Sequence, residues 1–341
     1  MNRSIPILSL VFLFAASPLS WSAEDGVIIA KEISGAIPSG PEDAAWRAAP
    51  AVSVALYPQR SVLPRGEASK PAALSVQALY TQKELALRLE WDDPTQENRR
   101  DIGQFADAAG IQWPVRQETG AGLPYIGMGN PGSPVALWLW RADGPAETLA
   151  AEGFGSLTAQ PPDGVEARGQ WQDGKWRVVF RRALAASGEH ALRLEPMKLG
   201  QVPIAFTTWD GAVKQRNGDK KLSAWQYLKF ENGAPPSASM PRAASGNAET
   251  GRRLIAEKGC AGCHSYPGNP AAPAIGPDLS FAGGIHSADY LRESLRDPSK
   301  IVVPGKGFFI TQEGRRTSIM PPFEGSKQEY DDLLAFLKTL R

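Results

Sequence analysis

Hydrophobic and polar residues alternate with a period of two along several short segments before residue 210. Val76, Ala78 and Tyr80 alternate with other residues in one segment, and another segment repeats leucine at every second position up to Trp91. This period places one side of each segment in a core, as in β-strands. We predict strands at residues 73–80, 84–91, 135–140, 176–181 and 202–208.

Turn residues separate these segments. Asp173-Gly174 stands between Trp171 and Trp176, and a two-residue Asp-Gly turn is a strong signal for a β-hairpin. Long helical periodicity is nearly absent from this part of the chain. The pattern predicts a mainly β domain, an antiparallel β-sandwich with sizeable loops.

The C-terminal part of the chain has a helical period instead. Apolar residues repeat at helical spacing in residues 287–296 and 326–340, and an amphipathic segment spans residues 249–259. Ser287 and Ser326 stand where helix N-caps belong. We therefore expect a small all-α domain after the sandwich.

These patterns divide the 341 residues into four parts. Residues 1–23 combine Arg3, an apolar run and a stretch of small residues, as in a secretory signal peptide. The sandwich is expected over residues 24–234, a Pro-, Ser- and Ala-rich linker over 235–245, and the helical domain over 246–341. The apolar run is short for a membrane span, which takes about 20 residues. We expect export to the periplasm, and a protein that is not integral to the membrane once the signal is cleaved.

Charge is balanced after the signal is removed, with 36 basic and 36 acidic residues remaining. No basic patch is implied by this balance. Nucleic acid is therefore not expected as a partner.

The residues from Cys260 to His264 read C-x-x-C-H, the attachment signature of c-type haem. Cysteines at i and i+3 lie on one face of a helical turn, so both thiols can reach the vinyl groups of one porphyrin while His264 presents its imidazole to the iron. A zinc site needs about four ligands, and the chain's only two cysteines, Cys260 and Cys263, both lie in this motif. The sequence predicts one covalent haem c.

The whole segment from this motif onward resembles class I cytochrome c, through Ile275-Gly-Pro-Asp-Leu279 and Ser318-Ile-Met-Pro-Pro-Phe323. In that family a Met in a Pro-containing loop is the sixth iron ligand. The resemblance implies His264 as the proximal ligand and Met320 as the distal one. Two prolines after Met320 hold its loop extended, although a lone Met can also fill a core gap. His286 is the competing ligand in this domain, at a helix start where a solvated or capping His is common.

One glycine-rich motif matches the pattern of dinucleotide-binding proteins but lacks the structural context of that pattern. Residues 127–132 satisfy G-x-G-x-x-G, but Pro131 and Pro134 flank its end and a predicted strand follows. Without a helix N-terminus there is no row of free amides to hold a pyrophosphate. We do not expect dinucleotide binding.

The sandwich resembles the haem-binding γ subunit of ethylbenzene dehydrogenase and its relatives in dimethylsulfide dehydrogenase, selenate reductase and chlorate reductase. The resemblance covers nearly all of the domain in order. Its residues are Ala45-Trp46, Leu56-Tyr-Pro58, Ala78-Leu-Tyr80, Leu87-Arg-Leu-Glu-Trp-Asp-Asp-Pro94, Asp107-Ala-Ala-Gly-Ile-Gln-Trp-Pro114, Met128-Gly-Asn-Pro131, Pro134 to Trp140, and Ala205-Phe-Thr-Thr-Trp-Asp-Gly211.

The resemblance implies a second, non-covalent haem b in the sandwich, held by one Met and one Lys. The Met corresponds to Met128. The Lys corresponds to Lys220 or Lys221, and counting back from Ser223 favours Lys220. A lysine ligates iron only as the neutral amine, so the ligand should be the one of the pair that points inward. The ordinary alternative is that both lysines are solvated on a hairpin.

These features predict a dihaem electron-transfer protein that is not itself an enzyme. By resemblance, its partners are the catalytic and iron–sulfur subunits of a molybdenum oxidoreductase and a soluble c-type cytochrome or similar carrier. An alternative from another class is a monohaem cytochrome c that carries a haem-free β-sandwich. Such a module would bind carbohydrate through exposed aromatic residues.

Overall fold

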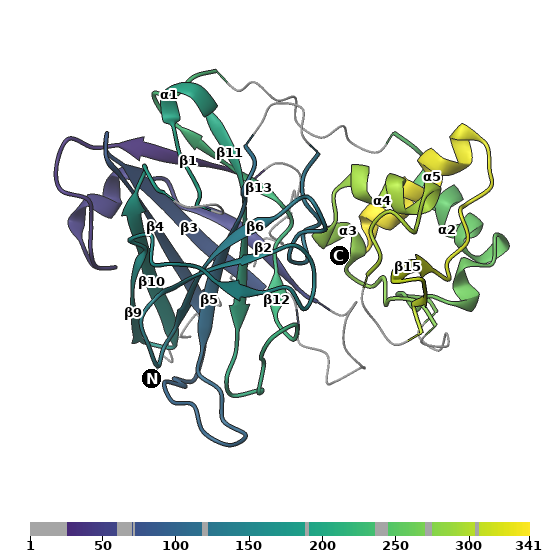
Figure 1. The fold of residues 1–341 in the computed structure, drawn as a ribbon, viewed down its shortest axis with the longest axis horizontal. Coiled ribbons are helices and arrows are strands. Elements are labelled where there is room, and N and C mark those ends of the chain that lie inside the picture. Colours follow the sequence, from purple (N-terminus) through teal and green to yellow (C-terminus); the bar gives the residue numbers. More distant parts are fainter. Residues whose placement is uncertain are drawn as a thin grey trace, which may run out of the picture.

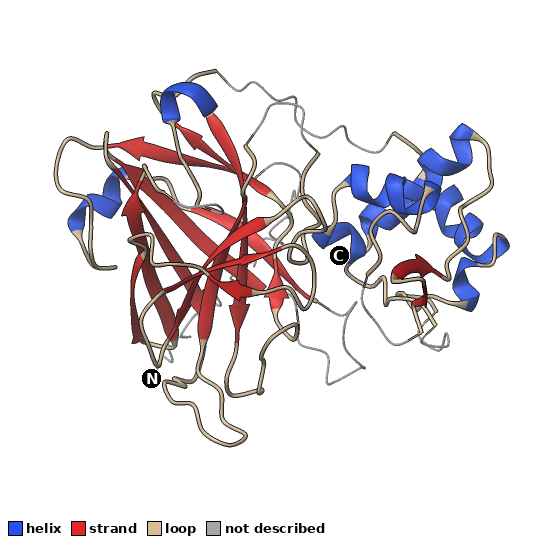
Figure 2. Ribbon diagram, in the orientation of Figure 1, coloured by secondary structure: helices blue, strands red, loops and turns tan. Residues whose placement is uncertain are grey.

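The structure, a computed structural model, describes residues 26–59, 70, 72–117, 122–187, 191–235, 245–269, 275–303 and 307–341. Strands dominate the part up to Phe230, and helices dominate the part from Ala248 onward (Figures 1 and 2). The predicted signal peptide and most of the predicted linker lie outside the described residues. Within the described ranges, no helix is long and apolar enough to cross a membrane.

The first part of the chain forms a 13-stranded sheet, in the order β8-β7-β6-β5-β11-β12-β2-β3-β4-β10-β9, with β1 and β13 joined to β3 and β11. The strands are β1 (Val27–Glu32), β2 (Val52–Pro58), β3 (Ala72–Tyr80), β4 (Glu84–Asp92), β5 (Ala108–Pro114), β6 (Val135–Arg141), β7 (Glu147–Ala151), β8 (Thr158–Ala159), β9 (Glu166–Gln172), β10 (Lys175–Ala183), β11 (Gln201–Trp209), β12 (Lys221–Leu222) and β13 (Gln226–Phe230). Two short helices, η1 (Ala44–Ala48) and α1 (Pro196–Leu199), accompany them.

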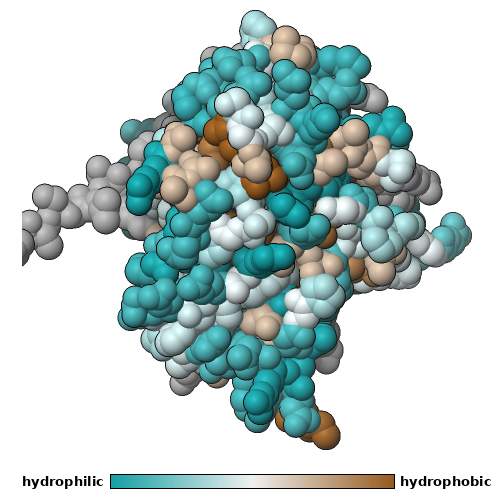
Figure 3. Space-filling view, turned by 90° about the vertical axis from the view of Figure 1, so that its left-hand side faces the viewer, coloured by the Kyte–Doolittle hydropathy of each residue, from teal (hydrophilic) through white to brown (hydrophobic). Residues whose placement is uncertain are grey.

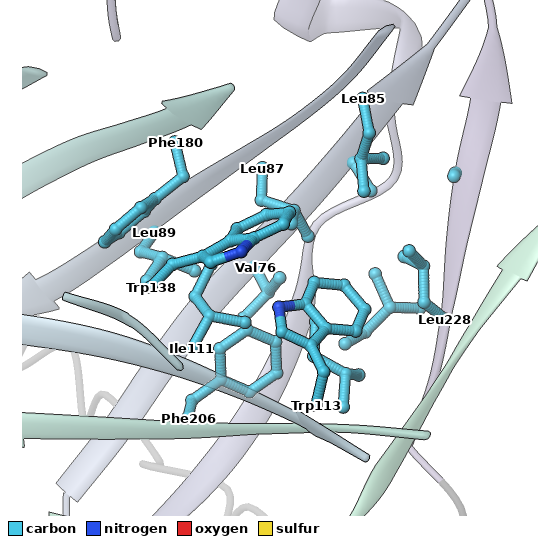
Figure 4. Packing of buried hydrophobic residues seen from close by; sticks show 14 of the residues in the cluster. Val76, Leu85, Leu87, Leu89, Ile111, Trp113, Trp138, Phe180, Phe206 and Leu228 are labelled. Carbon is cyan, nitrogen blue, oxygen red and sulfur yellow. The ribbon is translucent and has the colours of Figure 1, made fainter. Parts of the chain in front are cut away.

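The sheet folds over one hydrophobic core. Side chains of β5, β6 and β11, such as Trp113 and Trp138, face those of β3, β4 and β10, such as Leu87 and Phe180 (Figure 4). All four of these side chains are fully buried. The side of the molecule that Figure 3 shows, at the left of Figure 1, is largely hydrophilic with scattered hydrophobic residues. The alternating pattern therefore folds as predicted, into a mainly β domain.

The predicted strands agree with observed ones to within two residues, and the predicted Asp-Gly hairpin joins β9 to β10. Asp173 and Gly174 have φ values of 53° and 71°, both positive as a two-residue hairpin turn of this kind requires. Trp171 pairs directly with Trp176 across this turn. The sheet departs from a purely antiparallel arrangement at β1, which pairs in parallel with both β13 and β3.

The second part of the chain contains helices packed around a smaller core. They are α2 (Ala248–Glu257), η2 (Cys260–Gly262), α3 (Ala282–Ile285), α4 (Ala288–Arg296) and α5 (Lys327–Thr339). Ser287 and Ser326 cap α4 and α5 as predicted, because each side chain accepts a hydrogen bond from a backbone N–H of the first turn. A hairpin of β14 (Phe309–Gln312) and β15 (Arg315–Ser318) precedes the predicted Met320 loop and was not expected from the sequence.

Candidate haem sites

Met128 lies in the loop between β5 and β6, and its backbone is unusual. Its φ is 82°, a region that non-glycine residues seldom adopt and that persists only where surrounding structure enforces it. Here the Gly129 N–H donates to the Tyr125 carbonyl at 2.8 Å, and the Gly153 N–H donates to the Met128 carbonyl at 2.7 Å. These bonds fix the loop and hence the direction of the thioether.

Lys220 immediately precedes β12 and its side chain is turned inward. The residue is 4% exposed, and its Nζ lies 3.6 Å from the Met128 Sδ and 5.2 Å from the centre of the Trp209 ring. Burial lowers the pKa of Lys220 to about 8, and no carboxylate among the described residues forms an ion pair with it. Lys221, by contrast, is only half-buried and its main chain takes part in the β12 pairing with β2. Of the two lysines, the structure brings Lys220 to Met128.

The Lys220 amine and the Met128 thioether are two donors that would hold the iron of a non-covalent haem. A buried ammonium group ordinarily forms hydrogen bonds to oxygen acceptors that offset its desolvation. Among the described residues, the Lys220 amine instead donates to the Met128 thioether. Burial lowers the cost of the neutral amine, the form that can bind a metal. Apolar side chains pack around Met128, among them Val135 and Leu137.

The C-x-x-C-H motif begins in the 3-10 turn η2. Gly259, with φ of 78°, ends the preceding helical segment, and the His264 N–H donates to the Cys260 carbonyl at 3.0 Å. Residues three apart are eclipsed on a 3-10 turn, so Cys260 and Cys263 lie on the same side of it. Both thiols are free. The turn can thus present two thiols to one porphyrin, as the spacing predicts.

His264 is oriented for metal binding through one ring nitrogen. Its Nδ1 lies 2.9 Å from the Pro277 carbonyl oxygen, and burial lowers the pKa of His264, which favours the neutral ring. A neutral ring that donates from Nδ1 keeps a free lone pair on Nε2. A Cβ at Gly276 would come within 2.7 Å of the imidazole, so a glycine here gives the ring its space. The Gly276-Pro277 pair is visible in the sequence as part of a motif, but no sequence signal indicates this role.

The side chains of this site surround a cavity of about 570 Å³. Cys260, Cys263, His264 and Met320 all line it. Its volume is in the range of cofactor sites, roughly 300–1,000 Å³. The Met320 N–H donates to the Ser318 hydroxyl at 3.1 Å, which anchors the loop on the end of β15. The structure therefore brings together the four residues that the cytochrome c resemblance implies.

His286 lines the same cavity. The sequence suggested a solvated or capping residue at a helix start, and in the structure His286 is the C-cap residue of α3. Its ring stacks on Tyr125 from the sandwich and lies tilted against Tyr290 from α4. Burial lowers the pKa of His286 to about 3, so the ring is neutral. The sequence gives no local signal for this contact, because Tyr125 lies far away in the chain.

Together, the fold and the cavity define a β-sandwich protein with a C-terminal cytochrome c domain. A family model described as Ethylbenzene dehydrogenase matches residues 43–163, and one described as Cytochrome c matches residues 248–341. The chain belongs to the ethylbenzene dehydrogenase family, within the group of heme and gamma subunits that its relatives represent.

Three similar proteins support this assignment to the family. The chain is 35% identical over 221 residues to a protein of Haloferax mediterranei named for the heme subunit ORF7 of a respiratory nitrate reductase, covering 64% of this chain and 78% of the relative. It is 32% identical to the chlorate reductase subunit gamma of Ideonella dechloratans, over 60% of this chain and 84% of the relative. It is 30% identical to the dimethylsulfide dehydrogenase subunit gamma of Rhodovulum sulfidophilum, over 59% of this chain and 78% of the relative.

Among solved structures, a carbohydrate-binding module of family 9 from Caldicellulosiruptor kristjanssonii in complex with glucose aligns with a TM-score of 0.33 and 11% identity. The alignment covers 61% of this chain and 96% of that one. At this score the likeness carries no argument about the fold or the ligand of the sandwich.

Proposed function

We propose that the protein is a periplasmic dihaem electron-transfer subunit. It holds a non-covalent haem b between Met128 and Lys220, and a covalent haem c at Cys260 and Cys263. Its partners are the catalytic and iron–sulfur subunits of a molybdenum oxidoreductase on one side and a soluble c-type cytochrome or similar carrier on the other. The chain itself catalyses no reaction.

The observation that carries the haem b proposal is the pairing of a buried lysine with a thioether. Nothing in the hydrophobic pattern requires Lys220 to be inside, and an exposed lysine would avoid the cost of desolvation. The 3.6 Å separation of Lys220 Nζ and Met128 Sδ places two metal donors side by side in an apolar setting. A metal-binding role explains why such a lysine is retained there.

When bound, each haem supplies a reversible one-electron step at its iron. The residues of this chain hold and tune those groups. Lys220 and Met128 would hold haem b without a covalent bond, whereas Cys260 and Cys263 would hold haem c covalently. His264, oriented by the Pro277 carbonyl, and Met320 set the properties of the haem c iron, and the thioether raises its potential.

The relatives support the choice of partner. Two of them are named as gamma subunits, one of a chlorate reductase and one of a dimethylsulfide dehydrogenase. A gamma subunit with a fused cytochrome c domain can pass electrons from one haem to the next and then to a separate carrier. The substrate of the partner enzyme does not contact this chain in the proposed complex.

The alternative of a carbohydrate-binding sandwich requires an exposed aromatic platform. None of the tryptophans at described positions is exposed, and Trp113 and Trp138 are fully buried in the core. Trp113 and Trp138 therefore stabilise the core of the sandwich, and the electron-transfer proposal is the one that we develop.

The proposal is tested by ligand variants of the full-length protein. We expect Met128→Leu and Lys220→Gln each to deplete the haem b that acidified acetone extracts, while covalent haem c stays at the wild-type level. Lys221→Gln is the matched control, because Lys221 is adjacent but half-buried, and it should retain haem b. Full haem b in both Met128→Leu and Lys220→Gln would contradict this ligand assignment.

A further inference from the structure

We propose that a group of rings between the sandwich and the cytochrome c domain is the electron route between the two haem sites. This aromatic bridge consists of Tyr57, Tyr125, Phe281, His286 and Tyr290. The inference rests on the proposed function, since it concerns how the two haems of that proposal communicate. In Figure 1 the contact lies where α3 meets the end of β2.

The bridge begins in the loop that carries Met128. Tyr125 is three residues before Met128, its N–H donates to the Asn130 side-chain oxygen at 2.9 Å, and its carbonyl accepts the Gly129 N–H. The backbone of Tyr125 is therefore fixed by the same turn that aims the thioether. Its own side chain leaves the sandwich and reaches the helical domain.

In the helical domain, Tyr125 meets two rings that form a wall of the haem c cavity. The ring centres of Tyr125 and Tyr290 are 5.0 Å apart, and those of Tyr125 and His286 are 5.7 Å apart with an interplanar angle of 19°. His286 and Tyr290 contact each other at 4.6 Å. Both line the cavity together with Cys260. A single layer of rings thus connects Tyr125 with the haem c cavity.

A second connection begins at Lys220. The Lys220 carbonyl accepts a hydrogen bond from the Gln59 N–H at 2.9 Å, and the preceding residue, Pro58, lines the haem c cavity. Next to it, the ring of Tyr57 lies 5.9 Å from that of Phe281. Each residue of the proposed haem b ligand pair therefore has a short path of bonds and contacts to the same cavity.

The bridge is uncharged and closely packed. Burial lowers the pKa of His286 to about 3 and raises that of Tyr290 to about 12, so both rings are neutral near pH 7. A side-chain hydrogen bond joins Tyr290 to Tyr125 across the contact. Close packing of neutral groups fixes the distance between the two sites without the cost of burying a charge. The rate of electron tunnelling falls steeply with such distances and with gaps along the path.

Gly284 shows that the two domains are fitted to each other at this point. A Cβ on Gly284 would lie 2.6 Å from the ring of Tyr57, closer than real contacts allow. The clash falls on a buried ring, which cannot move aside freely. A methyl group at Gly284 would therefore push α3 away from β2 without removing any ring of the bridge.

The route is tested on the full-length dihaem protein by following electron redistribution between the b and c α-bands after rapid partial photoreduction. We expect the double variant Tyr125→Leu/Tyr290→Leu to lose the fast intramolecular phase, and Gly284→Ala to lose it as well. Tyr125→Phe keeps the ring and should retain this phase. Gly144→Ala is the matched glycine control, since among the described residues no atom beyond its chain neighbours lies within 4 Å of its Cβ position.

Haem content and the midpoint potentials of both haems are measured on each variant, so that lost cofactor is not read as a lost route. A wild-type fast phase in both the double variant and Gly284→Ala would overturn the route and leave the proposed function standing. Should the double variant fail to assemble, Gly284→Ala decides the question in the same way. A wild-type protein with no haem b would instead overturn the proposed function, and the route with it.

Discussion

Replacing Lys220 with methionine should stabilise the haem-b-free sandwich. Lys220 has a pKa of about 8 in the folded protein against an ordinary value of 10.5, and burial is the cause. One pKa unit corresponds to about 1.4 kcal/mol, so burying the ammonium group costs roughly 3 kcal/mol at neutral pH. Lys220→Met keeps a long apolar side chain and removes this cost. The haem-b-free variant should therefore be more stable by up to about 3 kcal/mol at pH 7.

The sign of the pH dependence follows from the direction of the shift. The pKa of Lys220 is lower in the folded state, so the unfolded chain binds the Lys220 proton more tightly. The wild-type protein therefore loses stability as the pH falls from 10.5 through 8. The gain from Lys220→Met should thus be full at pH 7 and shrink toward pH 10. At pH 7 we expect the urea midpoint to rise by about 1–2 M.

Urea unfolding followed by tryptophan fluorescence measures this directly. Every tryptophan lies at or before Trp225, so the signal reports the sandwich rather than the cytochrome c domain. Lys221→Met is the control and should change the midpoint little, because Lys221 is half-buried. A Lys220→Met protein that is less stable than haem-b-free wild type at pH 7, or equally stabilised at pH 7 and pH 10, would refute the reasoning.

Three further results are expected. The pKa of Asp93 is raised to about 7, mainly by burial and then by neighbouring carboxylates. Between about pH 4 and 7 the folded state therefore binds a proton that the unfolded chain has lost. The stability of the wild-type protein should fall as the pH rises through that range. Asp93→Asn should remove that slope, with a gain at pH 8 of as much as about 4 kcal/mol in urea unfolding. Arg182 and Asp163 form a buried ion pair at 2.6 Å, and Arg182→Met should destabilise the sandwich by about 3–5 kcal/mol, a prediction that an unchanged thermal midpoint would contradict. Met320→Ala should leave haem c attached, lower its potential and open the iron to carbon monoxide; if His286→Ala did so instead, the distal assignment would be wrong.

Elements with a strong local signal are readable from the sequence. The leucine alternation before Trp91 predicts β4 almost residue for residue, because one of its faces packs on a single core. Ser326 predicts the start of α5, and the structure adds a reciprocal hydrogen bond that the Ser326 N–H donates to the Glu329 carboxylate. The β14–β15 hairpin was missed although Glu313-Gly314, with φ of 50° and 76°, forms a two-residue turn like that of Asp173-Gly174.

Features that depend on distant pairing are not readable in this way. Adjacent residues of a strand point to opposite faces, so the inward member of the Lys220-Lys221 pair depends on how β12 aligns with β2 and β11. The contact of Tyr125 with Tyr290 depends on the docking of two domains, for which neither segment carries a pattern. The parallel pairings of β1 likewise join segments far apart in the chain.

The central claim is that one chain carries two haems of different type. A pyridine haemochrome spectrum of the purified, fully matured protein, taken before and after extraction with acidified acetone, counts both. We predict one haem b and one haem c per chain, with haem b in the extract and haem c retained by the protein. A spectrum with haem c alone would contradict it.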